Sequence, residues 1–413
     1  MLCLFNTLTR KVEPFKPIDD KKVKMYTCGP STYQPPHIGN YRTFLFEDIL
    51  QRYLEYSGFE VVRLMTLTDV EDKALAQAKK ENISVEELTR RNEEVLFRDF
   101  DFLKIKVPNY IVTASSVIDQ SAKMVDALVK KDYAYWHRHG DSINAYFEPL
   151  KFAGFGKLAR LNMNKWPKKK RRFHKDTYPG TPWNRGDFIL WHGCKEGETC
   201  WETEIGKGRP AWNIQDAAIV TKHFGFTVDI AAGGIDNLVR HHDYTLAVAE
   251  AISGLKFANF WLHGAHLFVE GSKMSKSKGN VIYPEDLATK DYTGDQTRFF
   301  LLYRHYRSKL NFTYEKLDAA SRRLDSFKNM IQDLRKAESP SPSEKAKKLL
   351  CAIVPSFEEA MNNDLNVKSA FDCLFDIVSK LDSLNRKGRL SAQVAKLALE
   401  ELTQVDRVLK IVF

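Results

Sequence analysis

The sequence has no apolar run long enough to cross a membrane and no cysteine pattern typical of a small disulfide or zinc scaffold. A membrane span needs about 18 or more consecutive apolar residues, and no stretch approaches that length. The start MLCLFNTLTRKVEPFK has no apolar segment followed by a cleavage signal. The cysteines include no CxxC pair and stand at Cys3, Cys28, Cys194, Cys200, Cys351 and Cys373. These absences predict a cytoplasmic protein with reduced cysteines and no membrane partner.

The composition is that of a globular protein with an excess of positive charge. Of 413 residues, 43% are hydrophobic and 28% are charged, which is enough for two or three domains with their own cores. The 63 Lys and Arg exceed the 53 Asp and Glu, giving a net charge of +10. Fixed positive charge favours an anionic partner, because each phosphate contact releases counterions. The sequence leaves the oligomeric state open.

The first third of the chain predicts the strand–helix–strand unit of a doubly wound sheet. Val23–Gly29 is a short β-rich run, and Tyr41–Tyr56 has the apolar periodicity of a helix. A second strand is predicted at Phe59–Leu67. Two strands joined by a helix form a right-handed parallel crossover, so we expect an α/β Rossmann-type parallel sheet. Ligands of such sheets bind at the carboxyl ends of the strands.

The rest of the chain predicts an insertion and a C-terminal α-helical bundle. Helical periodicity dominates from Ser84 to Lys130, and residues 132–207 look irregular. The sheet resumes at Thr227–Ala231 and Phe257–His263, the pattern after Lys273 is helical, and Glu338–Ser343 has the composition of a linker. The predicted division is 1–131 for the first half of the catalytic domain, 132–207 for the inserted region, 208–263 for the second half, 264–337 for a loop-and-helix module and 338–413 for the bundle.

Two short motifs carry the chemistry. His37, Ile38, Gly39 and Asn40 (HIGN) stand at the start of the first crossover helix, where free backbone N–H groups and the helix dipole favour phosphate. Far downstream, KMSKS comprises Lys273, Met274, Ser275, Lys276 and Ser277, between Gly271 and Gly279. A glycine-flanked loop with two ammonium groups suits a pyrophosphate leaving group, whose charge builds in the transition state. Alone, either motif could be a turn or a solvated basic loop.

Together, HIGN after the first strand and KMSKS after the last are the signature motifs of class I aminoacyl-tRNA synthetases, and the chain resembles the cysteinyl-tRNA synthetase family. The blocks that carry this resemblance run in the family's order, and among them are MYTCGPSTYQPPHIGN, TLTDVEDKA, GRPAWNIQ, DIAAGGID, FWLHG and SKMSKSKGN. The resemblance implies ATP with Mg²⁺, an aminoacyl-adenylate and transfer to tRNA. Many members have a further C-terminal domain, for which this sequence shows no counterpart. In this shortness the sequence also resembles the mycothiol-pathway cysteine ligase.

The resemblance also implies roles for particular residues. His37, Gly39 and Asn40 would contact the ATP phosphates, and the KMSKS residues would hold pyrophosphate through Lys273 and Lys276. Gly233, Gly234 and Asp236 would frame the adenosine, for which a carboxylate after a glycine pair can accept from both ribose hydroxyls. The amino-acid pocket would include Tyr33, Thr68 and Trp212.

The zinc pocket departs from the family. The family binds the substrate thiolate through a zinc ion held by two cysteines, a histidine and a glutamate. Cys28 and His241 keep two of these positions, while Asp216 stands at the second cysteine position and Thr245 at the glutamate position. Asp216 can ligate zinc through oxygen, whereas a Thr hydroxyl seldom does. Two alternatives therefore stay open. One is a zinc site of Cys28, Asp216 and His241. The other is no metal, with Cys28 a buried thiol and His241 a hydrogen-bonded core residue.

Intact ATP motifs beside an altered pocket suggest activation of another amino acid, or of cysteine without metal. Two further hypotheses remain. One is a small-molecule ligase that passes the adenylate to an amine instead of tRNA. The other is a binding protein that kept the fold and lost turnover. For tRNA, the basic run Lys168–Arg172 and the helical bundle offer phosphate contacts, although the run could equally be a solvated loop.

Overall fold

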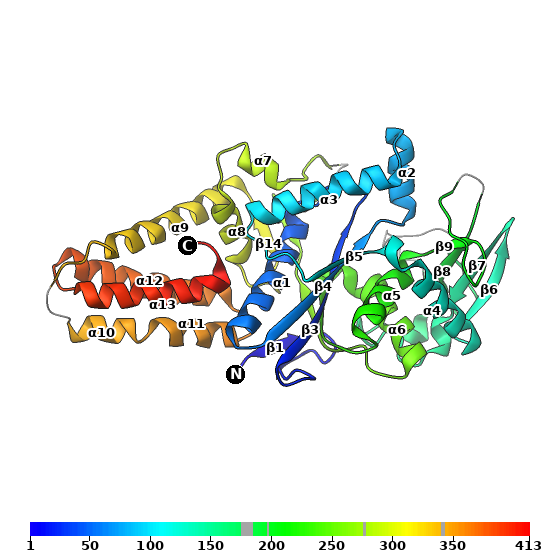
Figure 1. The fold of residues 1–413 in the computed structure, drawn as a ribbon, viewed down its shortest axis with the longest axis horizontal. Helices are drawn as coiled ribbons and strands as arrows, with labels where there is room; N and C mark the ends of the chain where they lie inside the picture. Colours follow the sequence, from blue (N-terminus) through cyan, green and yellow to red (C-terminus); the bar gives the residue numbers. More distant parts are fainter. Residues whose placement is uncertain (175–184, 196–197, 276–277, 340–342) are drawn as a thin grey trace.

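A computed structural model describes residues 1–174, 185–195, 198–275, 278–339 and 343–413. Figure 1 shows an elongated molecule with a helical bundle at one end, a sheet and its helices in the middle, and a second sheet at the other end. None of the helices in the described part of the chain combines the length and apolarity that a membrane crossing demands.

The central element is a five-stranded sheet of order β11-β10-β3-β4-β5 in which every neighbouring pair is parallel. This confirms the predicted Rossmann-type sheet. The strands are almost entirely buried, as expected for a parallel sheet covered on both faces. Their bounds are β3 Lys22–Ser31, β4 Glu60–Thr68, β5 Tyr110–Thr113, β10 Val228–Gly234 and β11 Ala258–Gly264.

The chain direction through this sheet creates a switch point beside β3. From β3 the chain continues to β4 on one side and later to β10 on the other. At such a point the connecting segments diverge and leave a crevice at the carboxyl ends of the strands. Gly29, near the end of β3, has no room for a side chain because an added Cβ would lie 2.0 Å from the Thr66 carbonyl oxygen.

Helices cover both faces of the sheet and divide the core in two. One apolar cluster joins α1 to the C-terminal bundle, and the other joins the opposite face to α4, α5, α6 and the insertion. The helices of this part are α1 Ile38–Tyr56, α2 Asp72–Glu81, α3 Val85–Phe102, α4 Ile118–Lys130, α5 Trp212–Phe224 and α6 Asp243–Ser253.

The middle region is not irregular, which corrects the sequence prediction. It forms a four-stranded antiparallel sheet of order β6-β7-β8-β9, with β6 Ala134–His139, β7 Ser142–Phe147, β8 Phe188–Gly193 and β9 Gly208–Pro210. Gly140, at φ +58°, makes the tight turn between β6 and β7. Part of the basic run serves this sheet: Lys170 Nζ lies 3.1 Å from Glu148 and Arg172 Nε donates to the Tyr135 hydroxyl at 2.9 Å.

The prediction that all cysteines are reduced is also wrong for one pair. Cys194 and Cys200, in the connection between β8 and β9, form a disulfide, and their Cα atoms are 5.9 Å apart. That distance is within the range that a disulfide requires. The spacing of six residues in the sequence does not by itself predict this distance. Cys3, Cys28, Cys351 and Cys373 are free.

After β11 the chain forms a small sheet and a helical region. The strands β12 Leu267–Val269, β13 Ser272–Lys273 and β14 Leu310–Phe312 pair in the order β13-β12-β14, so the segment after Lys273 is not purely helical as predicted. A hairpin of β1 Cys3–Asn6 and β2 Lys11–Pro14 lies at the N-terminus. The helices are α7 Pro284–Ala288, α8 Gly294–Leu302, α9 Tyr314–Leu334, α10 Glu344–Leu350, α11 Ile353–Asn362, α12 Val367–Arg386 and α13 Ala392–Leu409.

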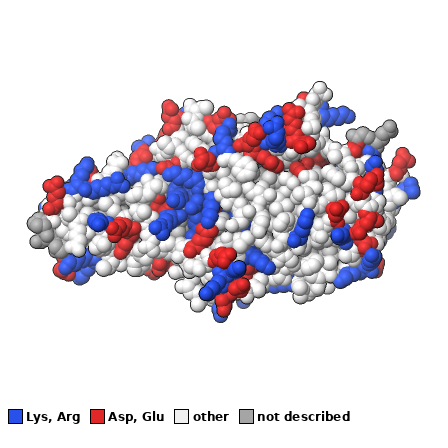
Figure 2. All heavy atoms as spheres, in the orientation of Figure 1, with Lys and Arg blue, Asp and Glu red and all other residues white. Residues whose placement is uncertain are grey.

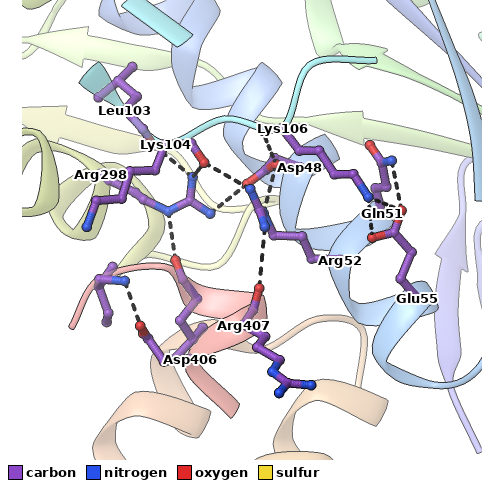
Figure 3. Close-up of polar contacts among 12 residues, drawn as sticks. Asp48, Gln51, Arg52, Glu55, Leu103, Lys104, Lys106, Arg298, Asp406 and Arg407 are labelled. Atoms are coloured by element: carbon purple, nitrogen blue, oxygen red, sulfur yellow. Dashed lines mark hydrogen bonds and ion pairs between the residues drawn. The ribbon is translucent and has the colours of Figure 1, made fainter. Parts of the chain in front are cut away.

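A buried ion pair joins this C-terminal part to α1 (Figure 3). Arg298 of α8 donates to Asp48 of α1 at 2.6 Å, and both side chains are fully buried. The same guanidinium donates to the carbonyl of Leu409 at the end of α13 and to that of Leu103 after α3. One side chain thus fixes the relative positions of four helices.

Candidate functional site

A cavity of about 230 Å³ opens at the switch point of the parallel sheet. Its walls come from the carboxyl ends of β3, β10 and β11 and from the first turn of α1. The lining residues are Cys28, Gly29, Pro30, Ser31, Tyr33, Gln34, Pro35, Pro36, His37, Gly39, Asn40, Thr43, Phe44, Lys73, Gly234, Asp236, Asn237, Gly264, Ala265, His266, Leu267, Lys273 and Met274. The sequence motifs therefore meet in one place.

HIGN forms the cap of α1. The His37 ring accepts from the Asn40 N–H at 3.3 Å, and the Asn40 side chain accepts from the His37 N–H at 3.0 Å. This reciprocal cap points the first turn of α1 into the cavity, where its positive dipole end favours phosphate. Burial lowers the pKa of His37, and Lys273 adds to the effect, so the ring is neutral at physiological pH.

The KMSKS segment lies against HIGN. An added Cβ on Gly39 would lie 2.7 Å from Met274 Cε, so the glycine permits this close approach. The Asn280 side chain accepts from the Ser275 N–H at 2.9 Å and donates to the Lys273 carbonyl at 3.3 Å, closing the segment on itself. Lys273 faces the cavity from β13. The predicted Lys276 and Ser277 lie outside the described residues.

The opposite wall comes from β10 and β11. Gly234 and Asp236 line the cavity, as predicted for an adenosine site, together with His266 just after β11. Gly233 lies behind this wall, where an added Cβ would approach His242 Cε1 to 2.7 Å. Gly234 thus forms part of the cavity wall, while Gly233 leaves room for the His242 ring to pack behind it.

Cys28, Tyr33 and Lys73 line another part of the cavity, where the amino-acid pocket is expected. The Lys73 ammonium lies 5.2 Å from the centre of the Tyr33 ring, a cation–π contact. Burial raises the pKa of Tyr33, with a further contribution from Glu71. Thr68, predicted for the same pocket, does not line the cavity and instead accepts from the Thr32 N–H through its carbonyl at 3.0 Å.

Behind Cys28 lies a buried hydrogen-bonded group that we call the Asp216 cluster, consisting of Tyr26, Cys28, Asp216 and His241. His241 Nε2 is 2.6 Å from Asp216 Oδ2 and 3.0 Å from Cys28 Sγ. The Tyr26 hydroxyl donates to the same Asp216 oxygen. Trp212 stacks on the His241 ring with centroids 5.2 Å apart. The cluster therefore lies behind the part of the cavity wall that Cys28 forms.

Burial and neighbouring groups shift the pKa values of the side chains in this cluster. Burial opposes ionisation of Asp216, but His241 and the hydrogen bond from Tyr26 outweigh it and lower the pKa of this carboxyl. Burial, and then the Asp216 charge, raise the pKa of the Cys28 thiol well above its usual value. The same causes raise the pKa of Tyr26. The wall thus presents a neutral thiol to the cavity.

Thr245 and two buried residues of α5, Asn213 and Gln215, have structural roles. Thr245 donates to the His241 carbonyl at 3.0 Å, one turn earlier. Asn213 donates to the Ile189 carbonyl at 2.8 Å, and Gln215 donates to the Val70 carbonyl at 2.6 Å. These hydrogen bonds are made to backbone groups of this chain. None of the three side chains lines the cavity that the described residues form.

A metal-ligating group is nevertheless present in the described residues. The ligand atoms of Cys28, His241 and His242 all lie within 4.8 Å of one another and could hold a metal ion. His241 and His242 occupy a single π-helical turn, Leu238–His242, a local irregularity that often accompanies functional sites. The four-ligand zinc set implied by the resemblance does not fit, because Thr245 is turned to the backbone and Asp216 is engaged with Tyr26 and His241.

Among the cavity residues that sequence reasoning missed are two with ionisable side chains, Lys73 and His266. Both follow the carboxyl end of a strand of the central sheet, β4 and β11 respectively. The rule that ligands collect at these ends could have found them. Of the predicted residues, Trp212, Asp216, His241 and Thr245 lie behind the cavity wall, and Ser275 is held by Asn280.

Two family models match the chain. The model for tRNA synthetases class I (C) catalytic domain covers residues 14–322, and the DALR domain model covers residues 356–413. The chain is 37% identical to the cysteine–tRNA ligase of Chlamydia pneumoniae, over 99% of this chain and 86% of that protein. It is 34% identical to that of Protochlamydia amoebophila, over 99% and 85% respectively.

Solved structures agree with the fold. Methionyl-tRNA synthetase of Mycobacterium tuberculosis in complex with methionyl-adenylate superposes with a TM-score of 0.67 over 95% of this chain and 90% of that one. The Agrobacterium radiobacter LeuRS–tRNA–LeuAMS ternary complex gives the same score over 96% and 85%. At 14% and 12% identity these two likenesses bear on the fold alone.

Proposed function

The chain belongs to the cysteinyl-tRNA synthetase family, and from that premise we propose that its cavity joins cysteine to ATP and passes the aminoacyl group to a tRNA. The amino-acid carboxylate attacks the α-phosphorus of ATP, the bond to the β-phosphate oxygen breaks, and pyrophosphate leaves with its electron pair. The 3′-terminal hydroxyl of the tRNA then attacks the mixed anhydride and releases AMP. One observation carries the proposal: HIGN, Lys273 and Asp236 line a single cavity at the switch point.

The residues of this chain contribute position and charge rather than a covalent intermediate. The first turn of α1, capped by His37, presents N–H groups to the phosphates. Lys273 faces the same space and neutralises the leaving pyrophosphate. Asp236 accepts from the ribose hydroxyls. Mg²⁺ accompanies the triphosphate as part of the substrate and shields its charge.

Cysteine is proposed because buried side chains close the cavity behind Cys28, which favours a short side chain in the substrate. Cys28 lines the cavity, and the Asp216 cluster with Trp212 fills the space behind it. Cysteine is also the amino acid in the names of the relatives. Tyr33 and Lys73 on the facing wall orient the backbone of the substrate.

Transfer to tRNA is favoured over transfer to a small amine by the C-terminal bundle, which matches the DALR domain model. Arg335, Lys396 and Arg407 line a groove between α9 and α13. On the face shown in Figure 2, Lys and Arg side chains gather where the bundle meets the sheet region. Clustered cations of this kind suit a phosphate backbone. We also propose a cytoplasmic location, and the five-part domain division given above with the inserted region extended to Pro210, because β9 pairs with β8 of the insertion sheet.

The test compares two assays on one preparation. Cysteine-dependent ATP–pyrophosphate exchange measures the first step, and charging of total tRNA measures the second. We expect both to proceed and His37→Ala to lower both in parallel. Robust exchange without any charged tRNA would contradict the proposed acceptor and support the small-molecule ligase. The matched control is His139→Ala, which changes an exposed histidine of the insertion sheet.

A further inference from the structure

On the basis of the proposed function, we propose that this protein recognises its amino-acid side chain without a metal, through the Asp216 cluster. The cluster takes the place of the zinc that the family resemblance implies. The ligand it would take is a small amino acid with a short, neutral side chain, and cysteine is the member of that class assigned above.

The hydrogen on His241 Nε2 is the first argument. Asp216 Oδ2 accepts from the Tyr26 hydroxyl and lies 2.6 Å from His241 Nε2. A carboxylate oxygen is an acceptor only, so Nε2 must carry the hydrogen of this contact. A protonated ring nitrogen has no lone pair for a metal. His241 is thus committed to Asp216 through the nitrogen that faces Cys28.

The spacing of the groups is the second argument. A tetrahedral zinc with bonds of about 2.0 to 2.3 Å separates its ligand atoms by roughly 3.4 to 3.6 Å. The separations from His241 Nε2 are 3.0 Å to Cys28 Sγ and 2.6 Å to Asp216 Oδ2. Both are hydrogen-bond distances, so these atoms are too close together to surround an ion.

The second ring nitrogen of His241, Nδ1, also lacks the contact expected in a metal-bound histidine. A metal-bound histidine almost always donates its second ring N–H to a carboxylate, a carbonyl or water, which orients the ring. His241 Nδ1 is buried and has no hydrogen-bond partner among the described residues. The ring is oriented instead by stacking on Trp212 and by Asp216.

His242 does not complete an alternative site. Its Nδ1 is 2.9 Å from His263 Nε2, and His263 Nδ1 is 2.9 Å from the Thr7 hydroxyl, so a hydrogen-bonded chain holds the ring. With a hydrogen on His241 Nε2, the ligand atoms left in the group of Cys28, His241 and His242 are Cys28 Sγ and one nitrogen of His242. Two ligands do not hold a structural or catalytic zinc, which takes three or four from the protein.

A site without a metal is expected to separate cysteine from serine less well than a zinc site. A soft metal prefers a thiolate to a hydroxyl strongly, whereas a metal-free wall must separate cysteine from serine mainly by size and shape. Pockets of that kind discriminate such near-isosteres by about 10² or less. We therefore expect the ratio of kcat/KM for cysteine to that for serine, in pyrophosphate exchange, not to exceed about 10².

The test measures zinc directly and then rebuilds the missing ligands. Elemental analysis of purified wild type is expected to give zinc far below stoichiometry, and a zinc-selective chelator is expected to leave the exchange rate unchanged. The double variant Asp216→Cys/Thr245→Glu restores the ligand types of the family and is expected to bind zinc stoichiometrically and to raise the cysteine-to-serine ratio. Cys373→Ser, at an exposed thiol of α12, is the control for adventitious metal.

Stoichiometric zinc in wild type that is lost in His241→Ala would overturn the inference. So would loss of exchange on chelation of wild type. If the double variant fails to fold, the zinc content of wild type still decides. Absence of exchange with every amino acid counts against the proposed function, whereas zinc content decides the inference independently of activity.

Discussion

At the scale of single residues, we expect the charge of Lys273 to matter most in the transition state. It is exposed on β13 and faces the cavity beside Met274 and Gly39. Charge that develops only on the departing pyrophosphate is best met by such a fixed cation. We expect Lys273→Ala to lower kcat for pyrophosphate exchange about 10²- to 10³-fold while changing KM for ATP little.

The control for that variant is Lys278→Ala, an exposed lysine of the same segment that does not line the cavity. Steady-state exchange kinetics at varied ATP measure both variants. A fall in kcat of the same size at Lys278 would show that general loop charge, and not Lys273, stabilises the leaving group.

Asp243, the first residue of α6, is expected to set a pH dependence of stability. Burial raises the pKa of Asp243 to about 7, although backbone N–H groups, among them that of Ala159, act against the shift. The unfolded chain releases this proton near the ordinary Asp value of about 3.9, so it binds fewer protons than the folded chain between that pH and 7. The stabilising contribution is therefore complete below about pH 4 and is lost as the pH rises to 7.

Urea unfolding of Asp243→Asn across this pH range measures the effect. The variant should lose less free energy of unfolding than wild type as the pH rises, by up to about 1.4 kcal/mol per pH unit. Asp141→Asn, at an exposed turn of the insertion sheet, should follow the wild-type slope. Parallel slopes for wild type and Asp243→Asn would mean that Asp243 is already ionised in the folded protein at pH 4.

Much of the site could be predicted at the residue scale, and the limits are instructive. The HIGN residues His37, Gly39 and Asn40 line one cavity with Lys273 and Met274, as expected from the position of both motifs after a strand. The use of Asp216 and Thr245 could not be read from the sequence, since a side chain's partner depends on which groups the fold brings within 3 Å. Thr245 donates a hydrogen bond to the backbone one turn earlier, while Asp216 accepts one from Tyr26, 190 positions away in sequence.

At the scale of elements, the Asp48–Arg298 pair joins α1, which begins with HIGN, to α8 (Figure 3). Removing one partner of a buried pair typically costs about 3 to 5 kcal/mol, and loss of Arg298 also removes its hydrogen bonds to the Leu409 and Leu103 carbonyls, while Arg52 remains beside Asp48. We expect Arg298→Met to destabilise the protein by that amount in urea unfolding, and Asp48→Asn/Arg298→Met to show strong coupling. Arg90→Met, which breaks an exposed pair with Glu94, should cost no more than about 0.5 kcal/mol.

A loss at Arg298 no larger than at Arg90 would contradict this role. A second readout separates stability from function. Because the pair holds the helix that carries His37, Arg298→Met should also raise KM for ATP at temperatures where the variant remains folded.

Long elements were easier to predict than short ones. The strands β3 and β4 and the helix α1 have enough residues for their periodicity to be recognised. The four-residue strand β5 and the three-residue strands β9 and β14 have no periodicity of their own and exist only because a neighbouring strand pairs with them. The insertion looked irregular because Trp, Lys and His interrupt its alternation, although its hairpin pairs regularly.

At the scale of the whole molecule, the chain places a nucleotide-binding edge of a parallel sheet between an antiparallel insertion and a helical bundle (Figure 1). The order of these parts follows from the sequence, since the motifs lie at strand ends and the bundle is strongly periodic. Their packing does not, because it depends on buried contacts such as that of Arg298 with the carbonyl of Leu409. In the proposed function, the bundle would bind tRNA while the sheet carries out the activation.

The most direct measurement is ATP–pyrophosphate exchange with each of the twenty amino acids, run in the presence of a zinc-selective chelator. The proposed cavity predicts exchange with cysteine, weaker exchange with serine by no more than about 10², and little with long or charged side chains. Exchange with none of the twenty amino acids, by protein that binds ATP, would contradict the proposed activation of an amino acid in this cavity.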